Sequence, residues 1–232
     1  MIPEAFRIVA WNCAGKFAHN ADKLAALDAD ICIVPEVLEP QSTMLGDRYA
    51  GHWDGEKGKR GLLIAAKKDW RLDLVKTVQR RHMVLLAAHR GGVSVSVIGV
   101  WAMRGPQGYV GEVIEGLDTL LPLVEGVPNV FVAGDFNASP AFDATVPIQF
   151  AEISRRLQKC GLTSLWHERS GETFGQETSP TYHHQWKLNQ PFHIDFAFVS
   201  KGLAERCRGF EIGKFDNWNS ASDHMPLIAD FE

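Results

Sequence analysis

The sequence has little of what marks several common classes of protein. Its four cysteines include no Cys-x-x-Cys pair, which argues against a zinc ribbon and a thioredoxin-type redox site. Cysteines so widely spaced are typical of reduced core residues, so we expect a cytoplasmic protein without disulfides. No stretch approaches the roughly 18 uninterrupted apolar residues of a membrane-spanning helix, and residues 1–7 lack the apolar segment of a signal peptide. We therefore expect neither membrane insertion nor secretion.

An excess of positive charge is also missing. The 232 residues include 28 acidic and 24 basic side chains, for a net charge of −4. This balance excludes a generally basic coat protein for nucleic acid, but an enzyme needs only a local basic track and a bound cation. A hydrophobic fraction of 45% argues against disorder. Since no linker rich in Pro, Gly or Ser divides the chain, we expect one domain over residues 1–232.

Short apolar segments rich in Val, Ile and Phe predict β-strands, because each has strand length and is bounded by turn-forming residues. They are residues 6–11, 31–34, 62–66, 84–88, 93–101, 130–133, 194–199 and 227–231. Helical periodicity predicts helices over residues 110–124 and 150–160, and a third over 21–27. This pattern favours an α/β fold, either two packed sheets flanked by helices or a single mixed sheet. Residues 168–191 form the longest irregular stretch, and such loops are more often functional than passive.

Polar side chains stand at the ends of these strands. They are Asn12, Glu36, Asp135, Asn137, Asp195, Asp223 and His224. A buried strand end is a costly place for a carboxylate unless it is paired or bound to a cation. Any one of these residues is explained as a turn residue or a helix cap. Their recurrence at five strand ends argues against coincidence, and the spacing of Asp135 and Asn137 directs both side chains to one side of an extended backbone.

Together, these motifs resemble those of the endonuclease/exonuclease/phosphatase superfamily, which includes DNase I, exonuclease III-type abasic-site nucleases, sphingomyelinases and inositol polyphosphate 5-phosphatases. The matching motifs are Trp11-Asn12, Glu36, Gly134-Asp135-Phe136-Asn137, Ile194-Asp195 and Ser222-Asp223-His224. They span nearly the whole chain, in the expected order. The resemblance implies a four-layer α/β/β/α sandwich, with two mixed sheets face to face and helices outside. It also implies hydrolysis of a phosphate ester with Mg²⁺ or Mn²⁺.

The resemblance assigns the main metal role to Glu36, with Asn12 and Asp223 completing that site directly or through water. A hard divalent cation suits this chemistry, because it prefers carboxylate and amide oxygens and offsets the negative charge of the phosphate. Mg²⁺ usually keeps several waters, so one or two protein carboxylates suffice.

By the same resemblance, Asp135 orients and deprotonates the attacking water, and Asn137 holds the phosphate or the pentavalent intermediate. Asp195 and His224 form a carboxylate–imidazole pair, in which the carboxylate raises the affinity of the imidazole for a proton. A protonated His224 then stabilises charge on the phosphate; a general-base role is the alternative. A second metal near Asp135, Asn137 and His224 is also left open.

The sequence departs from the family pattern at two positions. Many relatives carry Gln before the metal-binding Glu, where this chain has Pro35. Many also carry Tyr or His where Trp101 is the nearest match, and Trp offers only an N–H donor and a stacking face. Arg104 is our candidate for the phosphate contact that Tyr or His would make, and a plain core role for Trp101 is the alternative.

A local excess of positive charge lies between residues 56 and 81, which include nine basic and three acidic side chains. The basic residues are Lys57, Lys59, Arg60, Lys67, Lys68, Arg71, Lys76, Arg80 and Arg81. A positive track beside a metal site suits a polyanionic substrate, and Lys59 and Arg60 are our candidate contacts. The alternative is a solvated hairpin whose charges only aid solubility.

Aromatic residues give a second indication of a nucleic-acid substrate. Trp53, Tyr182 and Trp186 fall in expected loops, where bases could stack on them, although buried is the commoner fate of Trp. His183 and His184 are candidate phosphate contacts. Because adjacent residues of a strand point in opposite directions, we expect only one of the two histidines to face the site.

Three classes of function follow from these observations. The leading hypothesis is a metal-dependent nuclease, an endonuclease acting on DNA. The second is a phosphatase or phosphodiesterase for a small-molecule, inositol or lipid-type phosphate. The third, a non-catalytic binding protein of the same fold, conflicts with the presence of every chemical type that the reaction needs. The sequence gives little reason to expect an obligate protein partner.

Overall fold

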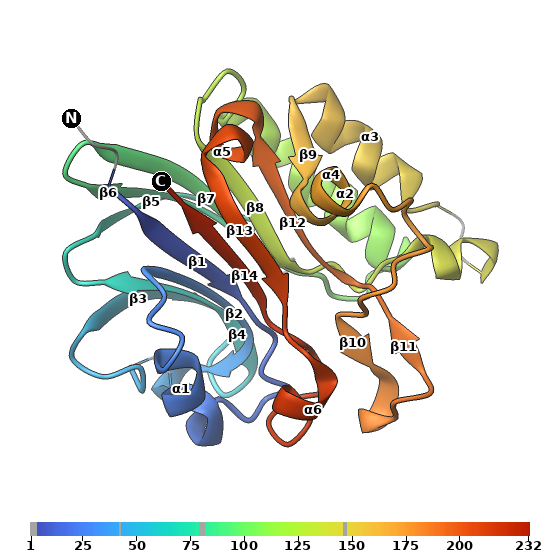
Figure 1. Cartoon of the computed structure of the whole chain (residues 1–232), viewed down its shortest axis with the longest axis horizontal. Helices are drawn as coiled ribbons and strands as arrows, with labels where there is room; N and C mark the ends of the chain where they lie inside the picture. The colour runs from blue at the N-terminus through green and yellow to red at the C-terminus, as the bar shows by residue number, and fades with distance from the viewer. Residues whose placement is uncertain (1–3, 42, 79–81, 146–147) are drawn as a thin grey trace.

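The computed structural model describes residues 4–41, 43–78, 82–145 and 148–232. In this part of the chain, two six-stranded sheets lie face to face, with helices on their outer sides (Figure 1). The first sheet has the order β13 (Cys207–Ile212), β14 (Leu227–Phe231), β1 (Phe6–Ala10), β2 (Ile31–Leu38), β4 (Arg60–Lys67) and β3 (Tyr49–Asp54). The second has the order β5 (Arg71–Val78), β6 (Met83–Arg90), β7 (Val93–Trp101), β8 (Val130–Asp135), β12 (Asp195–Ser200) and β9 (Leu162–Ser164). A separate hairpin pairs β10 (Tyr182–His183) with β11 (Pro191–Phe192).

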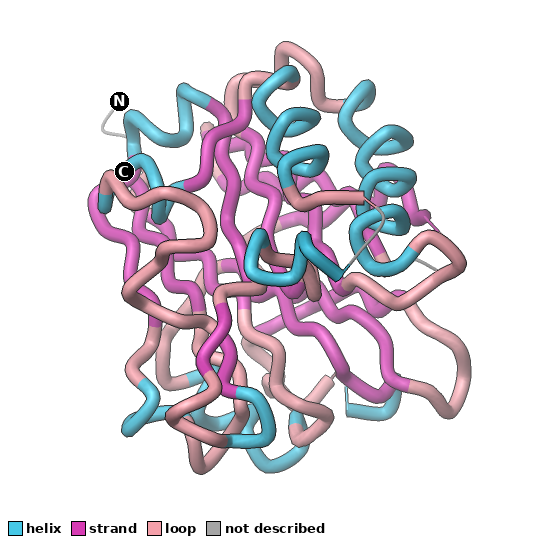
Figure 2. Tube along the Cα trace, turned by 90° about the vertical axis from the view of Figure 1, so that its right-hand side faces the viewer, coloured by secondary structure: helices cyan, strands magenta, loops and turns pink. Residues whose placement is uncertain are grey.

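The helices lie on the outer sides of the two sheets and at the ends of strands. They are α1 (Phe17–Ala25), α2 (Gly108–Leu120), α3 (Ala151–Lys159), α4 (Leu165–Ser170), α5 (Lys201–Arg206) and α6 (Phe215–Trp218). Short 3₁₀ turns are η1 (Glu39–Gln41), η2 (Leu121–Leu123), η3 (Pro140–Thr145) and η4 (His184–Trp186). Figure 2 shows α2 and α3 side by side in front of the strands, where their apolar faces pack on the second sheet. The predicted two-sheet α/β sandwich is confirmed.

Each predicted strand is present, and the predicted helices correspond to α2 with η2, to α3 and to α1, which begins at Phe17 rather than at residue 21. The sequence analysis missed β3, β5, β9, β10, β11 and β13. It was wrong to place Trp53 in a loop, because this residue lies in β3. The expected irregular stretch over residues 168–191 contains the end of α4, β10 and the start of β11.

Central strands such as β4 and β8 are buried on both faces. Between the sheets, Phe131 of the second sheet meets Phe231 of the first edge to face, with ring centres 6.0 Å apart. On the outer side of the second sheet, a separate core packs the strands against α2 and α3. Strand β8 contributes to both cores, and all six of its residues are buried. Such continuous apolar runs are what sequence analysis detects best.

Strand direction brings the polar ends of five strands to one edge of the sandwich. Strands β1 and β2 are parallel to each other, as are β7 and β8, so each pair ends at the same edge of its sheet. Strands β12 and β14 run the opposite way, so their first residues lie at that edge. Asp195 thus stands directly opposite Asp135 in the ladder between β12 and β8.

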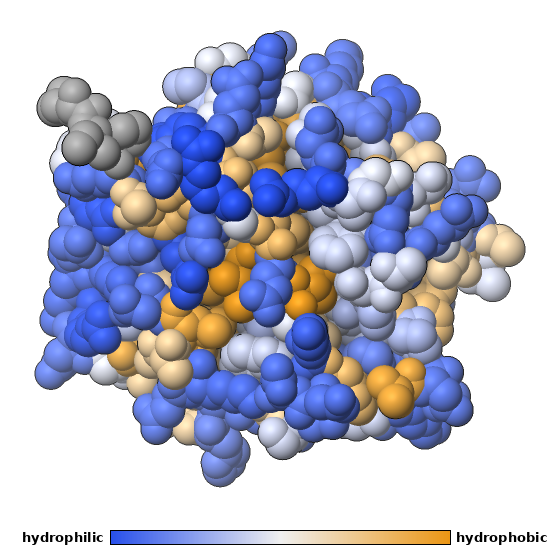
Figure 3. All heavy atoms as spheres, in the orientation of Figure 1, coloured by the Kyte–Doolittle hydropathy of each residue, from blue (hydrophilic) through white to orange (hydrophobic). Residues whose placement is uncertain are grey.

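The outer face of the first sheet is only partly covered by helix. Phe17 and Leu24 of α1 are buried in the same apolar core as Val9 and Cys32 of the strands. Figure 3 shows hydrophobic atoms gathered near the middle of this face, where Figure 1 draws β1 and β14, with hydrophilic side chains around them. The second sheet therefore has the more complete helical cover.

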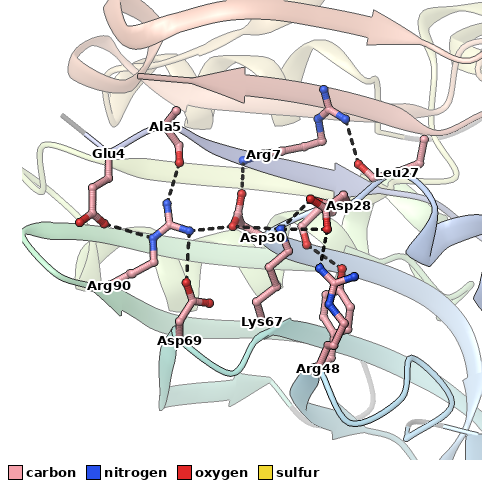
Figure 4. A network of polar contacts seen from close by, with 12 residues as sticks. Glu4, Ala5, Arg7, Leu27, Asp28, Asp30, Arg48, Lys67, Asp69 and Arg90 are labelled. Carbon is pink, nitrogen blue, oxygen red and sulfur yellow. Dashed lines mark hydrogen bonds and ion pairs between the residues drawn. The ribbon is translucent and has the colours of Figure 1, made fainter. Parts of the chain in front are cut away.

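A network of charged residues closes the end of the sandwich opposite to the polar strand ends (Figure 4). Asp30, which is 8% exposed, accepts hydrogen bonds from the backbone N–H of Arg7 at 2.8 Å and from Nη1 of Arg90 at 2.7 Å. The ammonium group of Lys67 lies 3.5 Å from the same carboxylate. Because these residues come from β1, β4, β6 and the residue before β2, Asp30 ties the two sheets together at this end.

We expect Asp30→Ala to lower the free energy of unfolding by about 2–3 kcal/mol, because it leaves a backbone N–H without its acceptor and removes the nearest carboxylate of the half-buried Arg90. Urea denaturation measures this change. The matched control is Asp28→Ala, since the exposed carboxylate of Asp28 pairs with Arg48 and Lys67 at the surface and such pairs contribute little. Equal stability of the two variants would contradict the role given to Asp30.

Candidate active site

Asn12 lies at the centre of the polar cluster, two residues after β1. Its side-chain nitrogen donates hydrogen bonds to Oε1 of Glu36 at 3.2 Å and to Oδ2 of Asp135 at 2.9 Å. Its side-chain oxygen accepts the backbone N–H of Ala14 at 2.9 Å. Asn12 is 1% exposed and lies behind the two carboxylates. In this arrangement it positions carboxylates from both sheets.

A β-bulge directs Glu36 away from the ladder of its own strand. Between Val34 and Val37, strand β2 has one residue more than β4, and Pro35 has no N–H to donate. The φ angle of Glu36 is +65°, in the left-handed region that non-glycine residues rarely adopt. The bulge leaves the Glu36 side chain free to point into a cavity, which accounts for the chain's tolerance of proline before it.

The guanidinium group of Arg60 binds the other oxygen of this carboxylate. Nη1 of Arg60 lies 2.6 Å from Oε2 of Glu36. The guanidinium also lies over Gly15, whose φ angle is +70° and which leaves no room for a side chain. The sequence-predicted contact residue Arg60 is therefore part of the site itself.

Asp135 is fixed by three hydrogen bonds at the end of β8. Besides the bond from Asn12, its Oδ1 accepts the backbone N–H of Asn137 and its Oδ2 the side-chain amide of the same residue, each at 2.9 Å. The amide nitrogen of Asn137 also donates to the carbonyl of Ala102 at 3.1 Å. Both amide hydrogens of Asn137 are thus in use, and the residue is arranged to position Asp135.

Asp195 and His224 form the predicted carboxylate–imidazole pair, with Nδ1 of His224 2.9 Å from Oδ2 of Asp195. A residue that the sequence analysis missed connects the two. Thr181 is fully buried; its hydroxyl accepts the backbone N–H of Asp195 at 2.9 Å, and its carbonyl accepts that of Met225 at 2.7 Å. A threonine within an irregular stretch gives no sequence signal of this role.

Ser222 links this pair to the Asn12 segment. Its hydroxyl donates to the backbone carbonyl of Asn12 at 2.8 Å and accepts the backbone N–H of His224 at 3.0 Å. The indole N–H of Trp11 donates to the carbonyl of His224 at 2.9 Å. The motifs near the two ends of the described chain therefore hold one another through buried hydrogen bonds.

The electrostatics of the cluster follow from burial and from crowded carboxylates. Burial raises the pKa of Asp135 to about 7, although the nearby His224 acts in the opposite direction. Burial also raises the pKa of Asp223. For His224, burial disfavours the imidazolium, but the carboxylates of Asp195 and Asp135 outweigh that effect and raise its pKa to about 10. The site thus favours a protonated His224. A bound cation would stabilise the ionised form of the neighbouring acids.

A cavity of about 460 Å³, here called the carboxylate cavity, opens beside these groups. Its lining includes Glu36, Asp135, Asn137, Asp223 and His224, together with Arg60, Trp101, Arg104, Tyr182 and Trp186. Asp195 and Asn12 lie behind the lining. A neighbouring cavity of about 500 Å³, the aromatic cavity, shares Arg104, Tyr109, Asn137 and Tyr182 with it.

The predicted substrate contacts divide into lining and buried residues. Tyr182 lines both cavities, and its hydroxyl lies 2.9 Å from Nδ1 of His184, which lines the aromatic cavity. His183 is buried against Phe215 on the other side of β10, so only one of the adjacent histidines faces the cavities, as expected. Trp186 lies at the rim, where the ammonium group of Lys16 is 4.2 Å from its ring centre.

The basic segment does not form a single track beside the site. Lys59 and Arg60 lie at the site end of β4, whereas Lys67 belongs to the Asp30 network at the opposite end of the same strand. Lys68 and Arg71 follow Lys67 in the chain, away from the site. Arg80 and Arg81 lie outside the described residues. The sequence could not show this division. Arg60 and Lys67 are close together in the chain, but they lie at opposite ends of β4 and therefore at opposite ends of the sandwich.

Trp53 and Trp101 are less available for stacking than the sequence suggested. The indole N–H of Trp53 donates to the carbonyl of Val37 at 2.7 Å, and its ring packs against the apolar core. Trp101 is 7% exposed and lies against the ring of His82, with ring centres 4.9 Å apart. Trp101 nevertheless forms part of the wall of the carboxylate cavity.

The donor set suits a hard divalent cation. Carboxylate oxygens of Glu36, Asp135 and Asp223 line one cavity, and no cysteine does so among the described residues. Asp135, Asp195 and His224 also place one possible ligand atom each within 4.8 Å of one another. Since Nδ1 of His224 is bound to Asp195, only its Nε2 is left for another partner.

Two mixed sheets packed face to face, with this polar cluster at one edge, form a DNase I-like fold. The sequence model of the endonuclease/exonuclease/phosphatase family matches residues 9–224, and the chain belongs to this family. The predicted resemblance is thereby confirmed. A comparison with curated protein sequences found no significant match.

Solved structures show the same fold at low sequence identity. D. rerio TDP2 complexed with a single-strand DNA product has a TM-score of 0.73 at 15% identity, covering 99% of this chain and 100% of that one. The 3′ phosphatase NExo from Neisseria, bound to a product DNA hairpin, has a TM-score of 0.71 at 18% identity, covering 98% and 99%. The endonuclease domain of the TRAS1 retrotransposon has a TM-score of 0.70 at 14% identity, covering 98% of each chain. None of the described helices is long and apolar enough to cross a membrane.

We expect Asp195→Asn to lower the pKa of His224 from about 10, because the variant removes the nearest carboxylate while burial still disfavours the imidazolium. NMR titration of the His224 ring in the metal-free protein measures the change. The unfolding free energy should also depend less on pH between 6.5 and 10, where native His224 keeps a proton that the unfolded chain releases.

The matched control is Asp223→Asn, which removes a carboxylate with a weaker effect on His224 and should lower its pKa less. A His224 ring that stayed protonated through pH 9 in Asp195→Asn would show that this pair does not set the titration.

Proposed function

We propose that the chain is a divalent-metal-dependent phosphodiesterase, a nuclease that cleaves DNA as an endonuclease with Mg²⁺ or Mn²⁺. The observation that carries this proposal is the convergence of Glu36, Asp135, Asp223 and His224 on one cavity. These groups come from both sheets, and the packing of the apolar core does not require them to lie together. Phosphodiester hydrolysis requires this combination of base, cation and metal ligands.

Asp135 is suited to accept the proton of the attacking water. Its carboxylate is held by Asn12 and Asn137, so its orientation does not change when a substrate arrives. Burial raises its pKa to about 7, which favours proton transfer near neutral pH. We infer that Asn137 and Asn12 act by positioning this carboxylate.

His224 is suited to stabilise the negative charge of the phosphate. Asp195 holds Nδ1, which leaves Nε2 of the protonated ring for a phosphate oxygen. Arg104 and Tyr182, which line the same cavity, are further candidate donors to the phosphate. Burial raises the pKa of Tyr182 to about 12, so its hydroxyl keeps its proton.

We infer that Glu36 and Asp223 hold the metal. When bound, a divalent cation would polarise the phosphate and offset its charge. The Arg60 guanidinium now on Glu36 would be free to contact the substrate once a cation took its place. A second ion near Asp135, Asn137 and His224 would have to bind His224 through Nε2.

Nucleic acid is the substrate class that the surroundings of the site favour. Arg60, Lys59 and Lys16 lie near the rim, and Tyr182 and Trp186 offer ring faces beside them. Two of the similar structures hold a single-strand DNA product and a product DNA hairpin. We also propose that residues 1–232 act as one domain, because both sheets share a core. The four free cysteines support a reducing compartment such as the cytoplasm.

With Mg²⁺ or Mn²⁺ we expect nicking of supercoiled plasmid that EDTA abolishes and added metal restores, because the reaction needs the cation. A panel with single-stranded DNA, an abasic-site duplex, RNA, bis-p-nitrophenyl phosphate and inositol phosphates tests the class. Phosphate release from monoesters alone would show that the protein is a phosphatase and not a nuclease. Full activity in EDTA would exclude the metal-dependent mechanism.

We expect Glu36→Gln to lower kcat/KM on any cleaved substrate by about 10²-fold or more, because the amide cannot replace a charged metal ligand. The control is Glu152→Gln, the same change in an exposed ion pair of α3, which should leave the rate within about twofold. Equal rates for both variants, with unchanged thermal unfolding, would show that Glu36 holds no essential ion.

A further inference from the structure

A third cavity, of about 590 Å³, lies beside the carboxylate cavity and has no assigned role. It is lined by Leu38, Glu56, Gly58, Lys59, Arg60, His82, Trp101 and Met103. Arg60, Trp101 and Met103 line both cavities, so the two adjoin each other. The third cavity is therefore placed to receive the next unit of an extended ligand whose scissile phosphate lies among the carboxylates.

His82 is the unusual residue of this cavity. Its φ angle is +44°, a conformation that directs the side chain away from the start of β6, and its ring lies on that of Trp101. Nδ1 of His82 faces Oδ2 of Asp54 at 3.4 Å, and the two side chains are only 13% and 16% exposed. Neither residue contacts the catalytic carboxylates directly, so the proposed hydrolysis does not account for this acid–imidazole pair.

The pair orients His82 for an anion in the cavity. The Asp54 carboxylate faces Nδ1, so Nε2 is the ring nitrogen left for a ligand in the cavity. Lys59 adds an ammonium group; its ion pair with Glu56 at 2.6 Å is exposed, and a phosphate can compete with it. Leu38 and Met103 give the same cavity an apolar wall.

We infer that this third cavity is a nucleotide subsite, in which His82 and Lys59 bind the phosphate next to the scissile one and the apolar wall contacts its sugar or base. The inference rests on the proposed nuclease function. The phosphate is either an internal diester of the strand or a terminal monoester, since the same donors suit both. Asp54 is a positioning residue in this arrangement.

The experiment compares a substrate that fills only the carboxylate cavity with one that extends beyond it. His82→Phe keeps a ring against Trp101 but removes both nitrogens, and Lys59→Ala removes an exposed charge. For a single-stranded oligodeoxynucleotide, KM should rise about tenfold in each variant with kcat nearly unchanged, while kinetics on bis-p-nitrophenyl phosphate stay within about twofold. Lys59→Ala should also reduce the slope of log Kd against log salt concentration by about one, as expected for the loss of one phosphate contact.

Lys68→Ala is the matched control, because it removes an exposed lysine of the same segment at the opposite end of β4 and should change neither substrate. Asp54→Asn should raise the oligonucleotide KM in the same direction as His82→Phe. If the rise in KM is larger for oligonucleotides with a terminal phosphate than for those without one, the ligand is the terminal monoester. If the rise is equal for both, the ligand is the internal diester.

Unchanged oligonucleotide KM in both His82→Phe and Lys59→Ala would overturn the subsite, as would an equal loss on the small diester. Anisotropy of a labelled oligonucleotide in EDTA gives a readout without catalysis, and Kd should again rise about tenfold. If the unmodified protein cleaved no phosphodiester, the proposed function would fail, whereas these Kd values would still decide whether the subsite exists.

Discussion

The side-chain amide of Asn12 hydrogen-bonds two carboxylates that come from different sheets, Glu36 of the first and Asp135 of the second. Apolar packing holds the sheets together but is not directional, so it does not by itself fix how one sheet edge lies over the other. Buried hydrogen bonds supply that alignment, because each unpaired polar group would lose its solvation without compensation. Together with the bond between His224 and Asp195, this contact across the sandwich fixes the geometry of the site.

Burying several acids close together raises the free energy of the folded state. Hydrogen-bond donors and cations beside the acids reduce this effect. Asp135 receives donors from Asn12 and Asn137, Glu36 receives the guanidinium of Arg60, and His224 carries a compensating charge beside Asp195. The opposite end of the sandwich is also charged, but there the buried acid, Asp30, already has its cations. The two ends therefore differ. The carboxylate of Asp30 is already paired with cations, whereas the acids of the site still favour the binding of a further cation.

The sequence predicted the elements whose pattern is imposed by burial on both faces, such as β8, and the polar residues at their ends. It missed β5, because this edge strand is exposed along most of its length and carries no apolar pattern. It also missed Thr181 and His82, whose roles depend on hydrogen bonds and ring contacts between segments far apart in the chain. For the same reason it placed Asn12 beside the metal and Asn137 beside the phosphate without showing that both amides donate hydrogen bonds to Asp135.

The hydrogen bond from Ser222 to Asn12 joins residues 210 positions apart. The strands that follow and precede them, β14 and β1, are neighbours in the middle of the first sheet. Contacts of such long sequence separation form late, because a large loop must close before they contribute. A partly folded chain would therefore present neither a complete set of metal ligands nor an ordered imidazole. For the phosphodiesterase proposed above, this coupling restricts hydrolysis to molecules that have finished folding.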